Sequence, residues 1–197
     1  MAGPIIHLRA AKEWAKGRPD LIECPEFYLG AIAPDAIHAC ANAGKDDKLR
    51  THLNNHGRLD MMPLAEYARA RKTAFDLGYL AHLLTDPFWC ASYHVIPGLL
   101  QEDGHTNPEI YYREMNRVES ALIDEDVFER LGRAVPPADH PLLRAAELDE
   151  WRRRVLAHSR DMAAEAGENG CITIAFVTSF VARAGHYIDD MIRRLGL

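Results

Sequence analysis

The chain has 197 residues, of which 48% are hydrophobic and 26% charged, a balance that is typical of globular proteins and excludes a disordered chain. Domains commonly have about 100–200 residues, so we expect residues 1–197 to form one domain. The formal net charge of −6 argues against a surface for duplex nucleic acid, because such surfaces are usually strongly basic.

The sequence shows no targeting or membrane signal. No apolar stretch reaches the roughly 20 residues that a membrane-spanning helix needs, and the start, MAGPIIHL, lacks the charged and long apolar regions of a secretion signal. We therefore expect a cytoplasmic protein without membrane insertion. The cysteines are scattered and form no C-x-x-C pair, so we expect buried free thiols rather than metal ligands at Cys24, Cys40, Cys90 and Cys171.

Helical periodicity dominates the first part of the chain. The pattern predicts a helix over residues 5–16, which Gly17-Arg18-Pro19 ends. A short helix over residues 26–33 should stop before Pro34, because the residue before a proline is pushed out of the helical conformation. Residues 40–62 are polar and rich in turn formers, which predicts a loop with at most one helical turn.

The strongest helical pattern covers residues 64–86. It is apolar nearly all round toward its end, so we expect that end to be buried. Pro87 should end or kink this helix. The remaining predicted elements are a loop over residues 92–107 and helices over 108–132, 142–166 and 170–195. The fold class that follows is all-α, as a single multi-helix domain.

The sharpest chemical feature lies in the strongest helix. His82 and Asp86 are four residues apart, which places both side chains on one helix face. Such a pair can bind one metal ion, or two if the carboxylate bridges. A buried Asp is costly unless it is paired, hydrogen-bonded or bound to a cation. The alternative interpretation is an Asp that caps the following turn and a His that is hydrogen-bonded in the core.

Other imidazoles and carboxylates raise the weight of the metal interpretation. The chain has 10 histidines. Sets of His and Asp are typical of hydrolytic zinc sites. Each of these residues alone could be a surface or capping residue, but together they predict a zinc site. The ligand types outside the strongest helix are His7, Asp35, His38, His52 and His56.

Three motifs in order resemble the zinc-dependent phospholipase C family, including its small intracellular bacterial members. They are LGAIAPDAIH at residues 29–38, KLRTH at 48–52 and LGYLAHLLTD at 77–86, and the early His7 also matches. The resemblance covers about residues 1–90. It implies an all-helical fold of the phospholipase C and single-strand nuclease type, with a zinc cluster in a cleft.

The resemblance also implies a ligand set. In the family, an Asp, a following His and an H-x-x-x-D pair bind zinc, and the last Asp bridges to a second zinc that also binds an early His. Position by position, this gives Asp35, His52, His82, Asp86 and His7. His38 and His56 are the alternatives to His52. The secreted members also use a processed N-terminal residue as a ligand, which we do not expect in a chain without a cleavable signal.

A third zinc ion has its own candidate ligands. The family binds it through a His shortly after the H-x-x-x-D pair and through a later H-x-x-x-E pair. Here His94 follows Asp86, and His186 and Asp190 offer H-x-x-x-D instead. His56 is a further candidate. For the late pair, the alternative is the polar end of an amphipathic helix.

The function implied is a zinc-dependent hydrolase of phosphoric esters. Two zinc ions about 3.5–4 Å apart can clamp a phosphate and lower the pKa of a shared water, which would then attack phosphorus in line. Asp35 is the catalytic candidate that orients or deprotonates this water. Lys48 and Arg50 could neutralise the phosphate, although loop solvation is the alternative role for both. The expected substrate is a small phosphoester.

Two other functions are weaker. A metal-stabilised helical scaffold without catalysis would be favoured by zinc in a closed four-ligand shell, whereas an open position favours the hydrolase. A phosphohydrolase of the HD type needs an adjacent His-Asp pair, and a zincin needs H-E-x-x-H. The sequence has neither motif.

Overall fold

The computed structural model describes residues 2–55, 58–96, 98–101, 103–162 and 170–196. The described part is built almost entirely of helices, which confirms the predicted all-α class. In chain order its elements are α1 (Pro4–Trp14), α2 (Pro19–Ile22), α3 (Pro25–Ile32), the 3-10 helix η1 (Ala33–Ala39), α4 (Lys45–Thr51), β1 (Asn54–Asn55), β2 (Arg58–Leu59), α5 (Met61–Ala70), α6 (Ala74–Tyr93), α7 (Pro108–Ser120), α8 (Glu125–Arg133), α9 (Ala145–Met162) and α10 (Ile174–Arg194).

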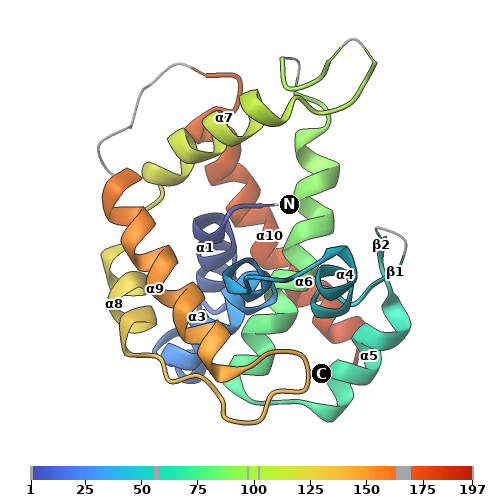
Figure 1. The fold of residues 1–197 in the computed structure, drawn as a ribbon, viewed down its shortest axis with the longest axis vertical. Coiled ribbons are helices and arrows are strands. Elements are labelled where there is room, and N and C mark those ends of the chain that lie inside the picture. The colour runs from blue at the N-terminus through green and yellow to red at the C-terminus, as the bar shows by residue number, and fades with distance from the viewer. Residues whose placement is uncertain (1, 56–57, 97, 102, 163–169, 197) are drawn as a thin grey trace.

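The helices surround one hydrophobic core. α3 packs most extensively against α6, α1 packs against α10, and α9 packs against η1. In Figure 1, α1 and α3 lie in the middle of the molecule, with α8 and α9 on one side, α6 on the other and α7 across one end. The middle helices are therefore covered on several sides, and polar side chains on their inner faces are withdrawn from water.

Two glycines let α3 and α6 touch backbone to backbone. A Cβ atom on Gly30 would lie 2.0 Å from the carbonyl oxygen of Phe75, and one on Gly78 would lie 2.0 Å from that of Phe27. No side chain larger than hydrogen fits at either position without moving a helix. This close approach brings the residues after α3 next to the middle of α6.

The α-helix α3 ends at Ile32, before Pro34, as the sequence predicts, but the chain stays helical beyond it. α3 continues directly into η1, and Pro34 lies in the first turn of this 3-10 helix. A missing N–H is tolerated in a first helical turn, because no carbonyl within the helix needs that donor there. Asp35 consequently lies within η1, where it is buried.

Residues 40–62 contain more regular structure than the predicted loop. α4 forms there, and the Gly44 amide donates a 3.0 Å hydrogen bond to the Asp47 carboxylate at its start. β1 and β2 then pair antiparallel, with Asn54 opposite Leu59. The polar composition of this segment concealed a short helix.

The predicted helix over residues 64–86 is two helices. The Thr73 hydroxyl accepts a 3.2 Å hydrogen bond from the Asp76 amide, and the Asp76 carboxylate accepts one of 3.1 Å from the Thr73 amide. This reciprocal capping box starts α6 anew. A similar break divides the predicted helix over 108–132, because Asp124 caps α8 by accepting from the Val127 amide at 3.3 Å.

Pro87 does not end α6, which continues to Tyr93. A proline inside a helix removes one backbone hydrogen bond. Here Trp89 and Tyr93, both beyond Pro87, are buried in the core. Their burial offsets the lost bond and keeps the last turns of the helix in place.

The other predicted helices and the predicted free thiols agree more closely with the structure. α1, α9 and α10 lie where helices are predicted, and the described residues between Tyr93 and the α7 cap Asn107 form no helix. All four cysteines are free thiols, half-buried rather than fully buried. In the described part of the chain, no helix combines the length and the hydrophobicity needed to cross a bilayer.

Candidate metal centre

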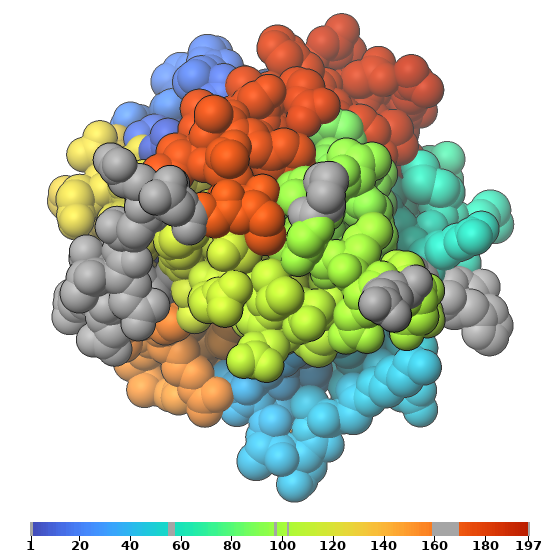
Figure 2. Space-filling view, turned by 90° about the horizontal axis from the view of Figure 1, so that it is seen from above, coloured from blue at the N-terminus to red at the C-terminus, as the bar shows by residue number. Residues whose placement is uncertain are grey.

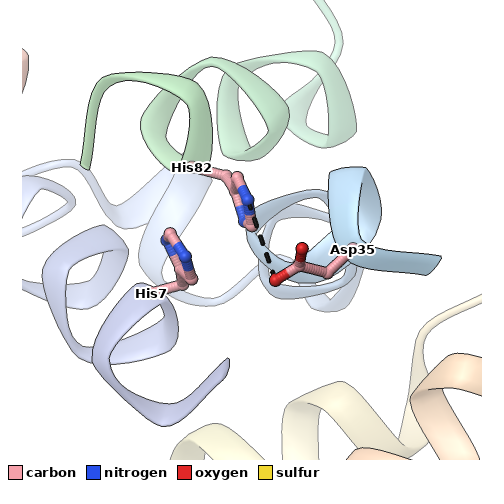
Figure 3. Close-up of side chains that lie close together, drawn as sticks. All are labelled: His7, Asp35 and His82. Carbon is pink, nitrogen blue, oxygen red and sulfur yellow. Dashed lines mark ion pairs between the residues drawn. The ribbon is translucent and has the colours of Figure 1, made fainter. Parts of the chain in front are cut away.

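Five polar side chains from four neighbouring parts of the chain converge in the interior, and we name them the His/Asp cluster. α1 contributes one of them, η1 one, the residue after α4 one, and α6 two. Each is at most 9% exposed. Figure 3 shows His7, Asp35 and His82 facing one another from three separate helices. The members of the cluster are His7, Asp35, His52, His82 and Asp86.

The ring nitrogens of the cluster lie a short distance from its carboxylate oxygens. His7 Nε2 is 3.4 Å from Asp86 Oδ1, and His52 Nε2 is 3.3 Å from Asp35 Oδ1. His82 Nε2 lies 3.8 Å from Asp86 Oδ2 and 4.0 Å from Asp35 Oδ2. These distances are too long for hydrogen bonds at full strength but leave room for a cation between the atoms.

The geometry defines two overlapping groups that could each hold a metal ion. His7, Asp35 and His82 offer ligand atoms within 4.8 Å of one another, and so do His52, His82 and Asp86. His82 belongs to both groups, and Figure 3 shows it beside Asp35 and His7. The H-x-x-x-D pair of α6 therefore lies at the centre of the cluster.

Several of these atoms are buried without a hydrogen-bond partner. They are both ring nitrogens of His7, Nε2 of His52, Nε2 of His82 and Oδ1 of Asp35. An unpaired buried polar atom is costly, and most buried polar atoms in folded proteins are paired. Divalent cations in the cluster would give a partner to one atom of each residue, and imidazole nitrogens with carboxylate oxygens are a ligand set that suits zinc.

Backbone carbonyls orient two of the imidazoles. His52 Nδ1 lies 3.0 Å from the carbonyl oxygen of Lys48, and His82 Nδ1 lies 2.9 Å from that of Ala31. An Nδ1–H that donates to a carbonyl leaves the lone pair on Nε2, which is the atom that faces the cluster. The sequence thus supplies both the ligand atoms and the groups that select their tautomer.

The His82 imidazole is held neutral. Its ring stacks on that of His7, with the centroids 3.6 Å apart and the planes 11° from parallel. Burial, reinforced by the neighbouring His7 ring, lowers the pKa of His82 to about 3. A neutral imidazole is the form that binds a metal ion.

Both carboxylates of the cluster are held ionised. Burial alone would raise the pKa of Asp35, but the adjacent imidazoles of His38 and His52 hold it well below its ordinary value. Burial would likewise raise the pKa of Asp86, and His7 and His82 lower it instead. The Asp86 carboxylate also accepts a 3.0 Å hydrogen bond from the Ala2 amide. The cluster is therefore charged as a cation site requires.

The structure separates the other residues that sequence motifs suggested near the cluster. His38 approaches it, with Nε2 3.6 Å from Asp35 Oδ1, but the ring is half-exposed and belongs to neither metal-holding group. Lys48 lines the same cavity as Asp35. Arg50 points elsewhere, because its guanidinium donates a 2.8 Å hydrogen bond to the carbonyl oxygen of Leu142. His56 lies outside the described residues.

The residues suggested for a third ion do not join the cluster. His94 is exposed, and its Nδ1 pairs with the carbonyl of Cys90 in its own helix. Asp190 is exposed and forms a 2.8 Å ion pair with Arg194, and His186 is exposed on the same helix. Among the described residues, none of these three belongs to a group that could hold a metal ion.

The cluster can be reached from two cavities. The Asp35 cavity, of about 510 Å³, lies between η1, α4, α7 and α9. The Asp86 cavity, of about 430 Å³, is bordered by His52 and Asp86 and has mainly apolar walls. In Figure 2, side chains of α7 (yellow-green), α9 (orange) and the light-blue segment that includes α4 come together on one face. Asp35 and Asp86 thus each face space that a small molecule could occupy.

One buried carboxyl beside the cluster was missed by sequence reasoning. Glu119 in α7 accepts a 2.9 Å hydrogen bond from the Ile6 amide, in the first turn of α1. A Cβ atom on Gly3 would lie 2.2 Å from its Oε2. Burial raises the pKa of Glu119 to about 8. The available signal was its spacing from Tyr111 and Met115, which places an acid on the apolar stripe of the helix.

Comparison with known protein families gives a match over much of the chain. Residues 7–131 match the family described as zinc dependent phospholipase C. This span is more than half of the chain and includes all five residues of the His/Asp cluster. Comparison with curated proteins and with solved structures gave no match. The family match confirms the resemblance that the three sequence motifs suggested, and the chain belongs to the zinc-dependent phospholipase C family.

Proposed function

We propose that the chain is a zinc-dependent hydrolase of small phosphoric esters. The observation that carries this proposal is the convergence of five buried ligand side chains whose free atoms face one another beside two cavities. A purely structural site would have little use for such access, because structural zinc is usually enclosed by four protein ligands. Access from a cavity is what a substrate needs.

The overlapping groups support two zinc ions. His7, Asp35 and His82 would hold one, and His52, His82 and Asp86 offer atoms for the other. The Nε2 atom of His82 can bind only one of the two ions, although His82 belongs to both groups. The carboxylates of Asp35 and Asp86 would therefore have to supply the ligand position that His82 leaves open on the other ion. Bound zinc would supply positive charge to the phosphoryl oxygens and lower the pKa of a coordinated water.

The residues of the chain have separate roles in this proposal. Asp35 orients the attacking water, since its Oδ1 has no hydrogen-bond partner and its carboxylate borders a cavity. Its pKa lies well below the ordinary value, so it accepts a hydrogen bond from water but is a poor store for the proton. Lys48 lines the same cavity and places a cation on its wall, which favours an anionic substrate.

Zinc content and turnover test the proposal together. The assays use 4-nitrophenyl phosphate and bis(4-nitrophenyl) phosphate with the purified chain and with His82→Ala, which removes the residue common to both groups. We expect about two zinc ions per wild-type chain, and loss of most zinc and at least about 100-fold of turnover in the variant. His186→Ala, on the exposed face of α10, is the matched control and should retain both properties.

A different result would favour the other function. Wild-type protein that keeps full zinc but hydrolyses neither ester would be a metal-stabilised scaffold. Unchanged zinc content in His82→Ala would refute the His/Asp cluster as the metal site.

A further inference from the structure

The Asp35 cavity has donors on its walls that the proposed hydrolysis does not use. Asp35 is the only one of the five cluster residues that lines it, and much of the remaining wall comes from α7 and α9, which contribute no residue to the metal site. Cavities of about 300–1,000 Å³ are typical of small-molecule sites, and this one, of about 510 Å³, is within that range. The walls decide what such a site accepts.

One of these donors is a buried indole. Trp151 of α9 lines the cavity, and its Nε1 is inaccessible to solvent and has no hydrogen-bond partner. A buried N–H without an acceptor is costly, and a ligand that supplies an acceptor removes that cost. The indole ring is held in place beside His38, with the ring centroids 5.8 Å apart.

A second donor is the ammonium group of Lys48 in α4. No ion pair between Lys48 and a carboxylate occurs in the described ranges of the chain, although most other cations there have one. Asn116 of α7 lines the same cavity and adds an uncharged amide. The three side chains come from three different helices, so they border the space from different sides.

The acidic groups of the cavity do not cancel this cation. Asp35 belongs to the His/Asp cluster and would be committed to zinc. Glu119 is buried, and its raised pKa, about 8, keeps the carboxyl largely uncharged at neutral pH. With metal present, the cavity therefore carries positive charge and free N–H donors, which favours anions and disfavours a cationic group.

We propose that Lys48, with the indole N–H of Trp151 and the amide of Asn116, binds a second anionic group of the substrate, beside the phosphoryl group at the His/Asp cluster. The substrate class is then a small phosphoester that also carries a carboxylate or a second phosphate. This inference rests on the proposed function, since the scissile phosphate is assigned to the metal site.

Matched diesters with one common leaving group test the assignment. The zinc-loaded full chain is assayed with 4-nitrophenyl phosphodiesters whose other arm is ethyl, 2-carboxyethyl or 2-(trimethylammonio)ethyl. A charge-assisted hydrogen bond predicts a kcat/KM about tenfold higher for the carboxyethyl than for the ethyl ester. Lys48→Met should abolish this preference, Lys48→Arg should retain most of it, and Trp151→Phe should reduce it by a few fold.

Lys45→Met is the matched control, because Lys45 lies on the same helix but does not line the Asp35 cavity. It should leave the ratio of carboxyethyl to ethyl turnover within about twofold of wild type. A ratio that is the same in Lys48→Met and wild type would overturn the inference. A wild-type preference for the trimethylammonio ester would overturn it as well.

A binding measurement separates this inference from the proposed function. If none of the three esters is hydrolysed, the proposed function fails, and calorimetry with 2-carboxyethylphosphonate and ethylphosphonate still tests the cavity. We expect the wild type to bind 2-carboxyethylphosphonate about tenfold more tightly than ethylphosphonate. Lys48→Met should bind the two phosphonates with equal affinity. Equal affinity of the two phosphonates for the wild type would refute the second anion site.

Discussion

At the scale of single residues, His140 shows how burial converts protonation into stability. Its Nε2 lies 3.0 Å from the Tyr67 hydroxyl, which donates its own proton to Asp76 at 3.0 Å. Nε2 must therefore be the N–H donor, and Nδ1 accepts the Leu142 amide at 3.4 Å. A second proton on this ring would break the bond to Leu142. Burial, with a smaller contribution from Arg71, lowers the pKa of His140 to about 4.

This pKa predicts a loss of stability in acid. Between pH about 6.5 and 4 the unfolded chain binds a proton at residue 140 and the folded protein does not, so the free energy of unfolding falls as the pH falls. The difference amounts to roughly 3 kcal/mol at most. His140→Gln removes this titrating group. Between pH 7 and pH 5, the free energy of unfolding measured in urea should therefore decrease less in the variant than in wild type. Equal decreases would contradict the prediction.

The carboxyl of Glu119 helps to hold the start of α1, the helix that carries the proposed zinc ligand His7. This carboxyl accepts a hydrogen bond from a backbone amide in the first turn of α1. The N-cap residue of this helix, Gly3, has no side chain that could accept that hydrogen bond. We expect Glu119→Leu to lower the free energy of unfolding by about 1–2 kcal/mol through the lost cap. Glu119→Gln keeps an acceptor oxygen and should lose less. Urea unfolding of both variants measures the effect, and equal losses would indicate that packing rather than the cap matters.

At the scale of helices, the contact between α3 and α6 positions the metal site. Asp35 follows α3 through η1, and His82 lies one turn beyond Gly78 in α6. Gly78→Ala places a Cβ 2.0 Å from a backbone oxygen of α3, so the helices must separate. We expect a loss of about 2–3 kcal/mol in unfolding free energy and a clear loss of bound zinc.

The control for this substitution lies in another helix. Gly132 of α8 has no atom within 4 Å of an added Cβ. Gly132→Ala should therefore be neutral or stabilising by up to about 1 kcal/mol, because alanine is the better helix former. The measurements are the free energy of chemical unfolding and the zinc content of both variants. Equal stability of Gly78→Ala and wild type would show that the close contact is not required.

Helix boundaries were the part of the fold that sequence patterns predicted least well. The break before α6 had a readable signal, since Thr73 and Asp76 have the spacing of a capping box. The passage through Pro87 had none, because the burial of Trp89 that offsets the lost hydrogen bond is a tertiary effect. Periodicity predicts that helices exist, whereas distant contacts decide where they end.

At the scale of the whole molecule, the sequence motifs predicted which side chains would meet but not what surrounds them. The spacing of His82 and Asp86 fixes their common face from local geometry alone. His7 and Asp35 could be added only through the family resemblance, because their approach depends on how α1 and η1 pack against α6. Trp151 lies far along the chain on a different helix, and no local pattern connects it to the site.

Zinc should also stabilise the fold as a whole, because the His/Asp cluster joins α1, η1, the end of α4 and α6. A ligand present at 100 times its Kd stabilises the folded state by about 2.7 kcal/mol. For a chain of this size that raises Tm by about 5–10 °C. We expect chelation to lower Tm by this amount and zinc, but not magnesium, to restore it.

Hydrogen exchange locates this effect within the molecule. The loss of protection on chelation should concentrate in α1, η1 and α6, whereas α8, which contributes no residue to the cluster, should change little. His82→Ala should respond to neither chelator nor zinc, because the residue shared by both groups is gone. A Tm that is unchanged by zinc in wild type, or a response that is the same in wild type and His82→Ala, would mean that these buried side chains do not bind the ion.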